Sequence, residues 1–160
     1  MSAVQNPIQS PAQSPTQSPA QNSTLSAEAI QAKFDGSPFI AWLGLSVTAV
    51  DHDRGELTVL APMRAEFERG AASGQWHGGP LAAVIDTVGD FAVGMLLGRG
   101  LPTINFRVDY LRPAVNTSLT AVARVRRNGR SVGVADVDLY NDQGALVAIG
   151  RATYATLSQG

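Results

Sequence analysis

The segment QWHGGPLAAVIDTVGDFAVGML, residues 75–96, has the apolar composition of a buried element but contains three side chains that can exchange protons. His77 precedes two glycines, and Asp86 and Asp90 follow within the apolar run. Burial disfavours the charged form of a carboxyl group unless water or polar partners reach it. A carboxyl group whose pKa is raised in this way is suited to proton-transfer chemistry. We therefore interpret Asp86 and Asp90 as candidate catalytic residues.

The spacing of the two carboxyl groups favours Asp86 as the principal acid–base group. Asp90 lies four residues further on, which is the same face of a helix, so its charge would repel that of Asp86 and tend to keep one of the pair protonated. Each residue also has a purely structural interpretation. Asp86 could satisfy a backbone group of a neighbouring strand, and Asp90 could lie at a contact between subunits.

The elements around these residues follow from the hydrophobic period. Residues 78–97 are apolar on nearly every side, with Pro80 where the first turn of a helix tolerates proline, which predicts a helix buried almost all round. A shorter helix is predicted from Ser26 to Phe34. Alternation of period two predicts strands in residues 45–53, 55–62, 103–113, 119–127, 131–140 and 145–157, and residues 63–74 read as a loop.

This order of elements predicts an α+β fold. One helix that is apolar on most of its surface needs a cover on most sides, and a curved antiparallel sheet wrapped around it provides one. In the strand from Thr103, alternation places Ile104, Phe106, Val108 and Tyr110 on one face and Thr103 on the other. Asn128-Gly129 between two alternating segments predicts a tight hairpin turn.

Composition excludes several functional classes. The 160 residues are 44% hydrophobic and 16% charged, which is enough for one domain with a sizeable core. A net charge of −1 gives no general attraction to nucleic acid or to an anionic membrane. Without cysteine, and with only His52 and His77 as histidines, we expect no metal site, and no glycine-rich loop points to a cofactor. We find no signal sequence and no apolar run of membrane-spanning length, and therefore expect a cytoplasmic protein.

The N-terminal region differs from the rest of the chain. Residues 7–22 read PIQSPAQSPTQSPAQN, a four-residue repeat of proline without a charged side chain. Such a segment cannot bury apolar area. We expect residues 1–25 to form a disordered tail and residues 26–160 to form the folded domain.

Three longer segments carry a resemblance to a known family. HGGPLAAVIDT, LPTINFRVDYLRPA and GRSVGVADVDLYNDQGALVAIGRATY resemble the hotdog-fold acyl-CoA thioesterases of the phenylacetate-degradation type, which are related to 4-hydroxybenzoyl-CoA thioesterase. The resemblance covers residues 36–157, and its most specific part is His-Gly-Gly, six residues and then an acid. It implies a hotdog fold, hydrolysis of an acyl-CoA, and a homodimer or homotetramer with active sites at the dimer interface.

The resemblance also implies roles for individual residues. The Gly78 N–H would polarise the thioester carbonyl, and the neighbouring Gly79 would contact the substrate. Asp86 would act as general base or nucleophile. The position of His77 at the helix start separately suits it to orient the loop or a substrate oxygen, and Thr103 at the start of its strand could contribute a hydroxyl to the water site.

One position departs from the family pattern. Many relatives have Asn or Gln seven residues before the first motif glycine, where its amide helps to hold the water or the carbonyl, but this chain has Ala71. Ser73 or Gln75 could take that role.

The sequence indicates the substrate-binding residues less specifically than the catalytic ones. Phe91 and Met95 are expected to line a pocket for an apolar or aryl acyl group. The CoA phosphates need basic groups, and the only basic cluster contains Arg124, Arg126, Arg127 and Arg130. The hairpin turn would present Arg127 and Arg130 to those phosphates.

Two other functions stay open at this point. A hotdog hydratase or dehydratase needs a histidine and an acid placed around one C–C–O unit, and His77 lies beside the carbonyl-binding glycine instead. A non-catalytic acyl-CoA-binding module has no need for Asp86 on an apolar helix.

Overall fold

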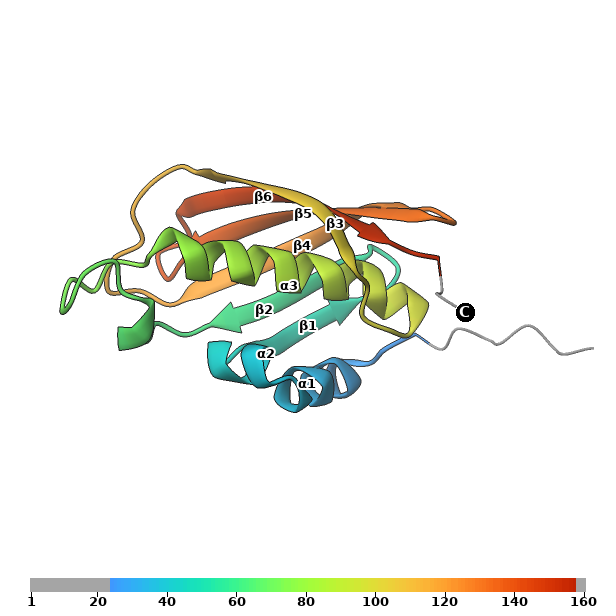
Figure 1. The fold of residues 1–160 in the computed structure, drawn as a ribbon, viewed down its shortest axis with the longest axis horizontal. Helices are drawn as coiled ribbons and strands as arrows, with labels where there is room; N and C mark the ends of the chain where they lie inside the picture. The colour runs from blue at the N-terminus through green and yellow to red at the C-terminus, as the bar shows by residue number, and fades with distance from the viewer. Residues whose placement is uncertain (1–23, 158–160) are drawn as a thin grey trace, which may run out of the picture.

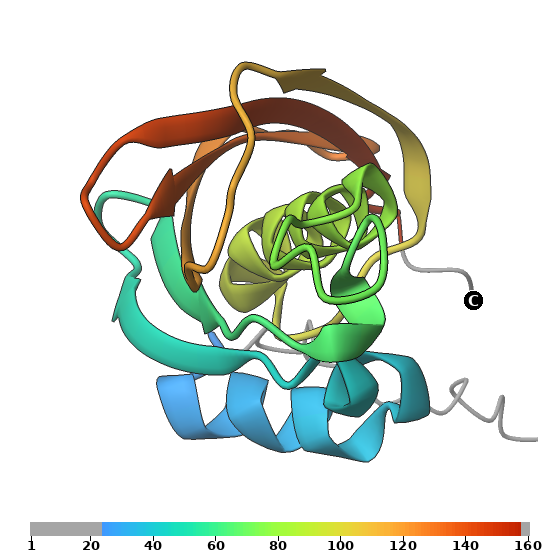
Figure 2. The ribbon, with the colours of Figure 1, turned by 90° about the vertical axis from the view of Figure 1, so that its left-hand side faces the viewer.

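The structure, a computed structural model, describes residues 24–157 and contains one curved sheet around one long helix. The elements are α1 (Ala27–Gly36), α2 (Pro38–Leu43), β1 (Ser46–Asp51), β2 (Glu56–Ala61), the 3-10 helix η1 (Ala65–Phe67), α3 (Gly78–Leu97), β3 (Thr103–Tyr110), β4 (Leu119–Asn128), β5 (Val132–Asn141) and β6 (Leu146–Ala155). All strand pairs are antiparallel, in the order β1-β2-β4-β5-β6-β3. Figures 1 and 2 show this sheet curving around α3, which confirms the predicted α+β hotdog architecture.

Helix α3 has the predicted bounds and the predicted burial. His77 is its N-cap, and Gly98 closes it in the left-handed conformation with φ 75°. The helix is 20 residues long with a mean hydropathy of 1.6 in its most apolar window, so the expectation that no apolar segment reaches membrane-spanning length was wrong. The wrapping of the sheet around α3 accounts for this composition, because the apolar faces pack against strands β2 to β6.

Two helices cover the side of α3 that the sheet leaves open (Figure 2). Helix α1 begins at Ser26, whose hydroxyl accepts the Ala29 N–H, and it buries Ile30 and Phe34. The Phe34 ring meets the Phe91 ring edge-on, with centroids 4.9 Å apart. This contact ties α1 to α3.

The predicted tail ends earlier than expected. Leu25 is buried, and its N–H donates to the Met95 carbonyl oxygen at 2.9 Å. The folded part therefore includes Leu25, whereas the proline repeat lies outside the described residues.

Helices α2 and η1 were not predicted. Pro38 starts α2 because its fixed φ suits the first helical position, and Gly44 ends it at φ 69°. With only six residues α2 is too short to show a hydrophobic period, so pattern reading misses it.

Strand β3 forms one edge of the sheet. Within the described residues it pairs only with β6, and Ile104 and Tyr110 are 57% and 53% exposed. The β3–β6 register shifts between Thr103 and Asn105. This irregularity places Thr103 on the same side as Tyr110, facing α3, whereas strict alternation predicted opposite faces.

Candidate functional site

Asp86 lies in the middle of α3 on the wall of a cavity of about 540 Å³. The Thr103 hydroxyl donates to Asp86 Oδ1 at 2.9 Å, and the Tyr154 hydroxyl donates to the Asp86 carbonyl oxygen at 2.9 Å. Burial raises the pKa of the Asp86 carboxyl, and the Thr103 hydrogen bond opposes that rise. Only one carboxylate oxygen has a hydrogen-bond partner among the described residues, so the other can accept a proton from a molecule in the cavity.

Gly89 makes the Tyr154 contact geometrically feasible. A Cβ at this position would lie 2.3 Å from the Tyr154 hydroxyl oxygen. The absence of a side chain thus lets β6 approach α3 one turn beyond Asp86 and hold that turn in place.

Asp90 lines the same cavity and is more deeply buried than Asp86. Its Oδ1 accepts the Leu101 N–H at 2.7 Å, which fixes the connection from α3 to β3. Burial raises the pKa of Asp90 to about 7; the Leu101 hydrogen bond and Arg99 lower it, while the Asp86 charge raises it further. The repulsion expected from Asp86 is therefore present, but burial is the larger cause.

The pKa of Asp90 makes stability depend on pH. Between about pH 4 and pH 7 the folded state keeps a proton on Asp90 that the unfolded chain releases, so stability falls as pH rises through this range. Asp90→Asn removes this loss and keeps an oxygen for the Leu101 N–H. We expect the variant to gain on the order of 2 kcal/mol over the wild type at pH 8 and little at pH 4. Urea unfolding of both proteins at the two pH values measures this, and a constant difference between them would contradict the assignment.

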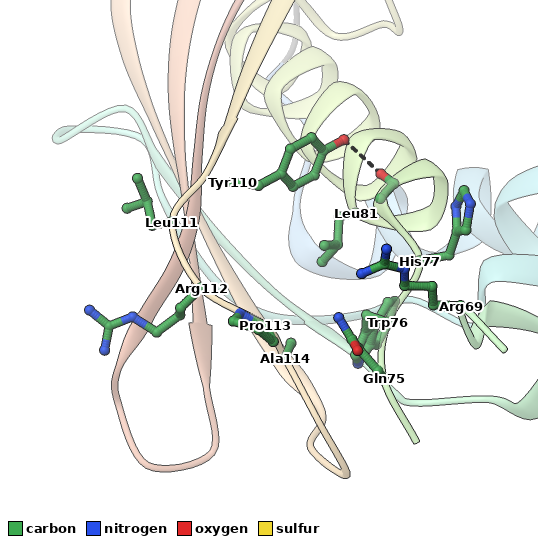
Figure 3. Close-up of a pocket in the computed structure, with 11 residues that line it drawn as sticks. Arg69, Gln75, Trp76, His77, Leu81, Tyr110, Leu111, Arg112, Pro113 and Ala114 are labelled. Carbon is green, nitrogen blue, oxygen red and sulfur yellow. Dashed lines mark hydrogen bonds between the residues drawn. The ribbon is translucent and has the colours of Figure 1, made fainter. Parts of the chain in front are cut away.

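The N-terminus of α3 forms a second region, with a cavity of about 390 Å³ (Figure 3). His77 Nδ1 accepts the Gly79 N–H at 3.0 Å, so the imidazole caps the helix. The Tyr110 hydroxyl donates to the Gly78 carbonyl oxygen at 2.8 Å. The Gly78 N–H has no partner among residues 24–157, which leaves this backbone donor available.

Gly78 and Asp86 are separated within one chain. They are eight residues apart in α3, which corresponds to about 12 Å along the helix axis. They also line different cavities: Gly78 lies with Tyr110 in the first-turn cavity, and Asp86 lies with Asp90 and Gly79 in the other. A single small group therefore cannot contact both residues of the same chain.

The loop before α3 contains Ala71 and the two residues, Ser73 and Gln75, that were predicted to replace the family amide. Ala71 is exposed, and the Ser73 hydroxyl accepts the backbone N–H groups of Gly70 and Gln75, both at 3.3 Å. Gln75 lines the first-turn cavity together with Gly78 (Figure 3). Of the two predicted substitutes, Gln75 is the one beside the glycine.

Phe91 and Met95 do not have the surroundings expected of pocket residues. Met95 has no exposed surface, and Phe91 is 5% exposed and packs against Phe34. Neither lines the cavities that contain Gly78 or Asp86. Their position in the core, on the side of α3 that faces α1 and the sheet, explains why apolar character alone was misleading.

The basic cluster divides into two parts. Arg124 is paired with Glu56 and Asp138, both at 2.9 Å, and Arg126 is paired with Asp136 at 2.9 Å. Arg127 and Arg130 are exposed at the β4–β5 hairpin and have no ion pair in the part of the chain that the structure describes. This hairpin lies at the end of the sheet near Thr103 and the C-terminal end of α3, away from Gly78 (Figure 1).

Sequence reasoning missed three residues of these regions. Tyr154 and Tyr110 hold backbone groups of α3, and Phe39 of α2 lines the Asp86 cavity. The tyrosines were visible only as members of strands. Within residues 24–157 no group of three or more histidine or acidic side chains could hold a metal ion.

Comparison with known proteins identifies the family of this chain. Residues 73–148 match the Thioesterase superfamily. The acyl-coenzyme A thioesterase PaaI of Escherichia coli is 32% identical over 67% of this chain and 75% of that protein. The medium/long-chain acyl-CoA thioesterase YigI of E. coli is 36% identical over 49% of this chain and 60% of YigI.

A solved structure shares the fold. The E. coli PaaI protein from the phenylacetic acid degradation operon superposes with a TM-score of 0.68 and 28% identity, over 80% of this chain and 90% of that one. The sequence similarity and the fold therefore identify the same family. The chain belongs to the thioesterase superfamily and is a hotdog-fold thioester hydrolase.

Proposed function

We propose that the protein hydrolyses an acyl-CoA to the free acid and CoA, with Asp86 as general base and the Gly78 N–H as the donor to the thioester oxygen. The observation that carries this proposal is the Asp86 carboxyl group on the wall of a cavity, with one oxygen held by the Thr103 hydroxyl at 2.9 Å and the other without a hydrogen-bond partner among the described residues. The relatives PaaI and YigI, both acyl-CoA thioesterases, support the choice of substrate class.

The reaction needs one proton transfer and one stabilised oxyanion. Asp86 takes a proton from water as the water oxygen bonds to the thioester carbonyl carbon, and the carbonyl oxygen becomes negative. The Gly78 N–H, at the positive end of α3, donates to that oxygen. The C–S bond then breaks, CoA leaves as a thiolate, and the proton on Asp86 passes to the thiolate or to solvent. Gln75, beside Gly78, supplies the side-chain amide.

The separation of Gly78 from Asp86 requires two subunits. We define the acid half-site as Asp86 with Thr103, and the amide half-site as Gly78 with Tyr110. About 12 Å lies between them in one chain, whereas the attacking water and the carbonyl oxygen of one thioester are adjacent atoms. A working site therefore combines the acid half-site of one subunit with the amide half-site of another.

The edge strand supports such an arrangement. Thr103 begins β3 and contacts Asp86, and Tyr110 ends β3 and contacts Gly78. If two β3 edges pair antiparallel and symmetrically about the middle of the strand, Thr103 of one subunit lies near Tyr110 of the other. This pairing brings the two kinds of half-site together twice per dimer and covers the exposed β3 edge.

Release of free thiol from a panel of acyl-CoAs tests the proposed reaction. We expect turnover of medium- or long-chain acyl-CoAs, the substrate class in the name of YigI. Absence of thiol release from every substrate of the panel, by a correctly folded protein, would exclude the proposal.

The hairpin arginines are the proposed contacts for the CoA phosphates. Arg127 and Arg130 lie at the Thr103 end of the sheet, so they serve the composite site that contains Asp86 of the same subunit. Replacing both with Ala should raise KM for acyl-CoA, and added salt should raise the wild-type KM in the same direction, because exposed phosphate contacts are screened. Steady-state kinetics with acyl-CoA and with a truncated thioester that lacks the nucleotide measure this. The truncated substrate is the control, and an equal loss on both substrates would show that the arginines act on the fold or the catalytic centre.

A further inference from the structure

Two cavities adjoin along the face of α3 that points toward α2. The cavity that contains Asp86 has a volume of about 540 Å³, and its neighbour has a volume of about 390 Å³. Phe39, Gly79 and Ala83 line both. We call the joint space the acyl groove, because it contains the proposed general base Asp86.

Helix α3 gives the acyl groove its length. Asp86, Ala83 and Gly79 succeed one another toward the start of the helix, so the groove follows α3 for roughly 10 Å. The small side chains of Ala82 and Ala83 leave room for a ligand beside the helix. An extended acyl chain of about eight carbons fits this length and lies against α3 without displacing a large side chain.

Aromatic side chains of α2 form the opposite wall. Phe39 is 54% exposed and Trp42 is 43% exposed, although large apolar groups are normally covered. The Trp42 ring packs edge-on against the buried Phe67 ring, with centroids 5.1 Å apart, and the Arg64 guanidinium donates to the Trp42 carbonyl oxygen. These contacts hold Trp42 in place, so it presents a fixed apolar surface to the groove.

Two carboxylates line the end of the acyl groove remote from Asp86. The Glu68 carboxylate accepts the backbone N–H groups of Ser73 and Gly74 at 3.2 and 3.3 Å, which fixes its position. Glu66 lies 3.8 Å from Arg64, its only ion pair among the described residues. No lysine or arginine lines either cavity; His77 is the only basic side chain that does.

We propose that the acyl groove selects an uncharged apolar acyl group, with Phe39 and Trp42 as its length-sensing wall, and rejects an acyl group that ends in a carboxylate because Glu66 and Glu68 lie where that carboxylate would be. This inference rests on the proposed thioester hydrolysis and adds to it a rule for which acyl groups are hydrolysed. Apolar chains gain from burial against the aromatic wall, and a terminal anion is repelled by the carboxylates of Glu68 and of the solvent-exposed Glu66.

The experiment compares octanoyl-CoA with octanedioyl-CoA, which has the same length and a terminal carboxylate. We expect kcat/KM to be at least ~30-fold higher for octanoyl-CoA. The double variant Glu66→Gln/Glu68→Gln should raise kcat/KM for octanedioyl-CoA by about tenfold and so narrow the ratio. Glu28→Gln, at an exposed position on α1 outside the groove, is the matched control and should leave the ratio unchanged.

The aromatic wall is tested by acyl length. Trp42→Ala should lower kcat/KM for octanoyl-CoA by about tenfold and affect butyryl-CoA less, because a four-carbon group does not reach Trp42. Leu157→Ala, at another exposed apolar side chain, is the control. Equal losses on both substrates would show that Trp42 supports the fold and does not sense length.

A binding measurement separates this inference from the proposed reaction. Calorimetric titration uses thioether analogues of the two substrates, which bind but cannot be hydrolysed. If neither substrate is hydrolysed but the octanoyl analogue binds at least ~10-fold more tightly than the octanedioyl analogue, the selection rule holds and the proposed reaction fails. Equal affinities, or equal kcat/KM values for the two substrates, would overturn the selection rule while leaving the reaction intact.

Discussion

Asp86→Asn is expected to lower kcat for acyl-CoA hydrolysis by at least ~100-fold, because the amide cannot take the proton from water. The variant should remain folded. Its amide oxygen can still accept the Thr103 hydroxyl, and the exchange removes a partly buried carboxyl group whose pKa burial raises. The loss should appear in kcat with little change in KM, since Asp86 acts on the attacking water.

Thiol-release kinetics measure this effect, and circular dichroism with size-exclusion chromatography checks the fold and the assembly. Asp53→Asn, at an exposed turn position far from the cavities, provides the matched control for loss of one carboxylate. A folded Asp86→Asn protein with near-wild-type kcat would rule out Asp86 as the general base. If the Asp90→Asn protein is folded but inactive at every pH, the assigned roles of Asp86 and Asp90 are reversed.

Co-expression of two inactive variants is expected to restore activity. Gly78→Pro removes the backbone N–H that we propose polarises the carbonyl, and the proline backbone fits because Gly78 is the first residue of α3 and His77 has an extended conformation. A Cβ at this position would lie 3.3 Å from the Tyr110 ring and hydroxyl, so the Tyr110 side chain must shift slightly. Alone, the variant should lose at least ~100-fold in kcat, the usual effect of removing one oxyanion donor. When Gly78→Pro and Asp86→Asn subunits are mixed, half of the dimers are hybrids. In each hybrid one of the two composite sites has both functional groups, so about a quarter of the wild-type activity should return.

Differently tagged subunits, purified through both tags, isolate the hybrid for thiol-release assays. The purified hybrid should have about half of the wild-type kcat. Sites confined to one chain would leave every hybrid site defective, so an inactive hybrid would rule out the composite site. Mixing either variant with itself is the control and should restore nothing.

The fold could be predicted from sequence largely because its helix and strands have clear hydrophobic periodicity. The buried helix at residues 78–97 and the alternating strands after it were confirmed, since a core helix and a half-covered sheet impose periods that sequence retains. Helix α2 was missed because six residues are too few for a period, and Leu25 was assigned to the tail because its burial depends on the distant Met95 carbonyl.

The sequence nominated candidate site residues but not the residues that surround them in the fold. Gly78 and Asp86 follow from a motif, whereas the hydrogen bonds from Thr103 and Tyr154 join segments 17 and 68 residues away. Phe91 and Met95 were assigned to a pocket because sequence does not tell which apolar side of a helix faces the core. The roles of Gly78, Asp86, Arg127 and Arg130 stay predictions until the variants are measured, as does the cytoplasmic location.

The irregular pairing at the start of β3 has a consequence for how this enzyme can change during evolution. In a regular strand, Thr103 and Tyr110 would point to opposite faces, because they are seven positions apart. The one-residue shift near Ile104 turns both toward α3, so a single strand supports an acid group at one end and an amide donor at the other. Deleting or inserting one residue here would turn one of the two contacts outward, and it would disable both composite sites of the proposed dimer together. Length changes in this strand should therefore be rare among active relatives.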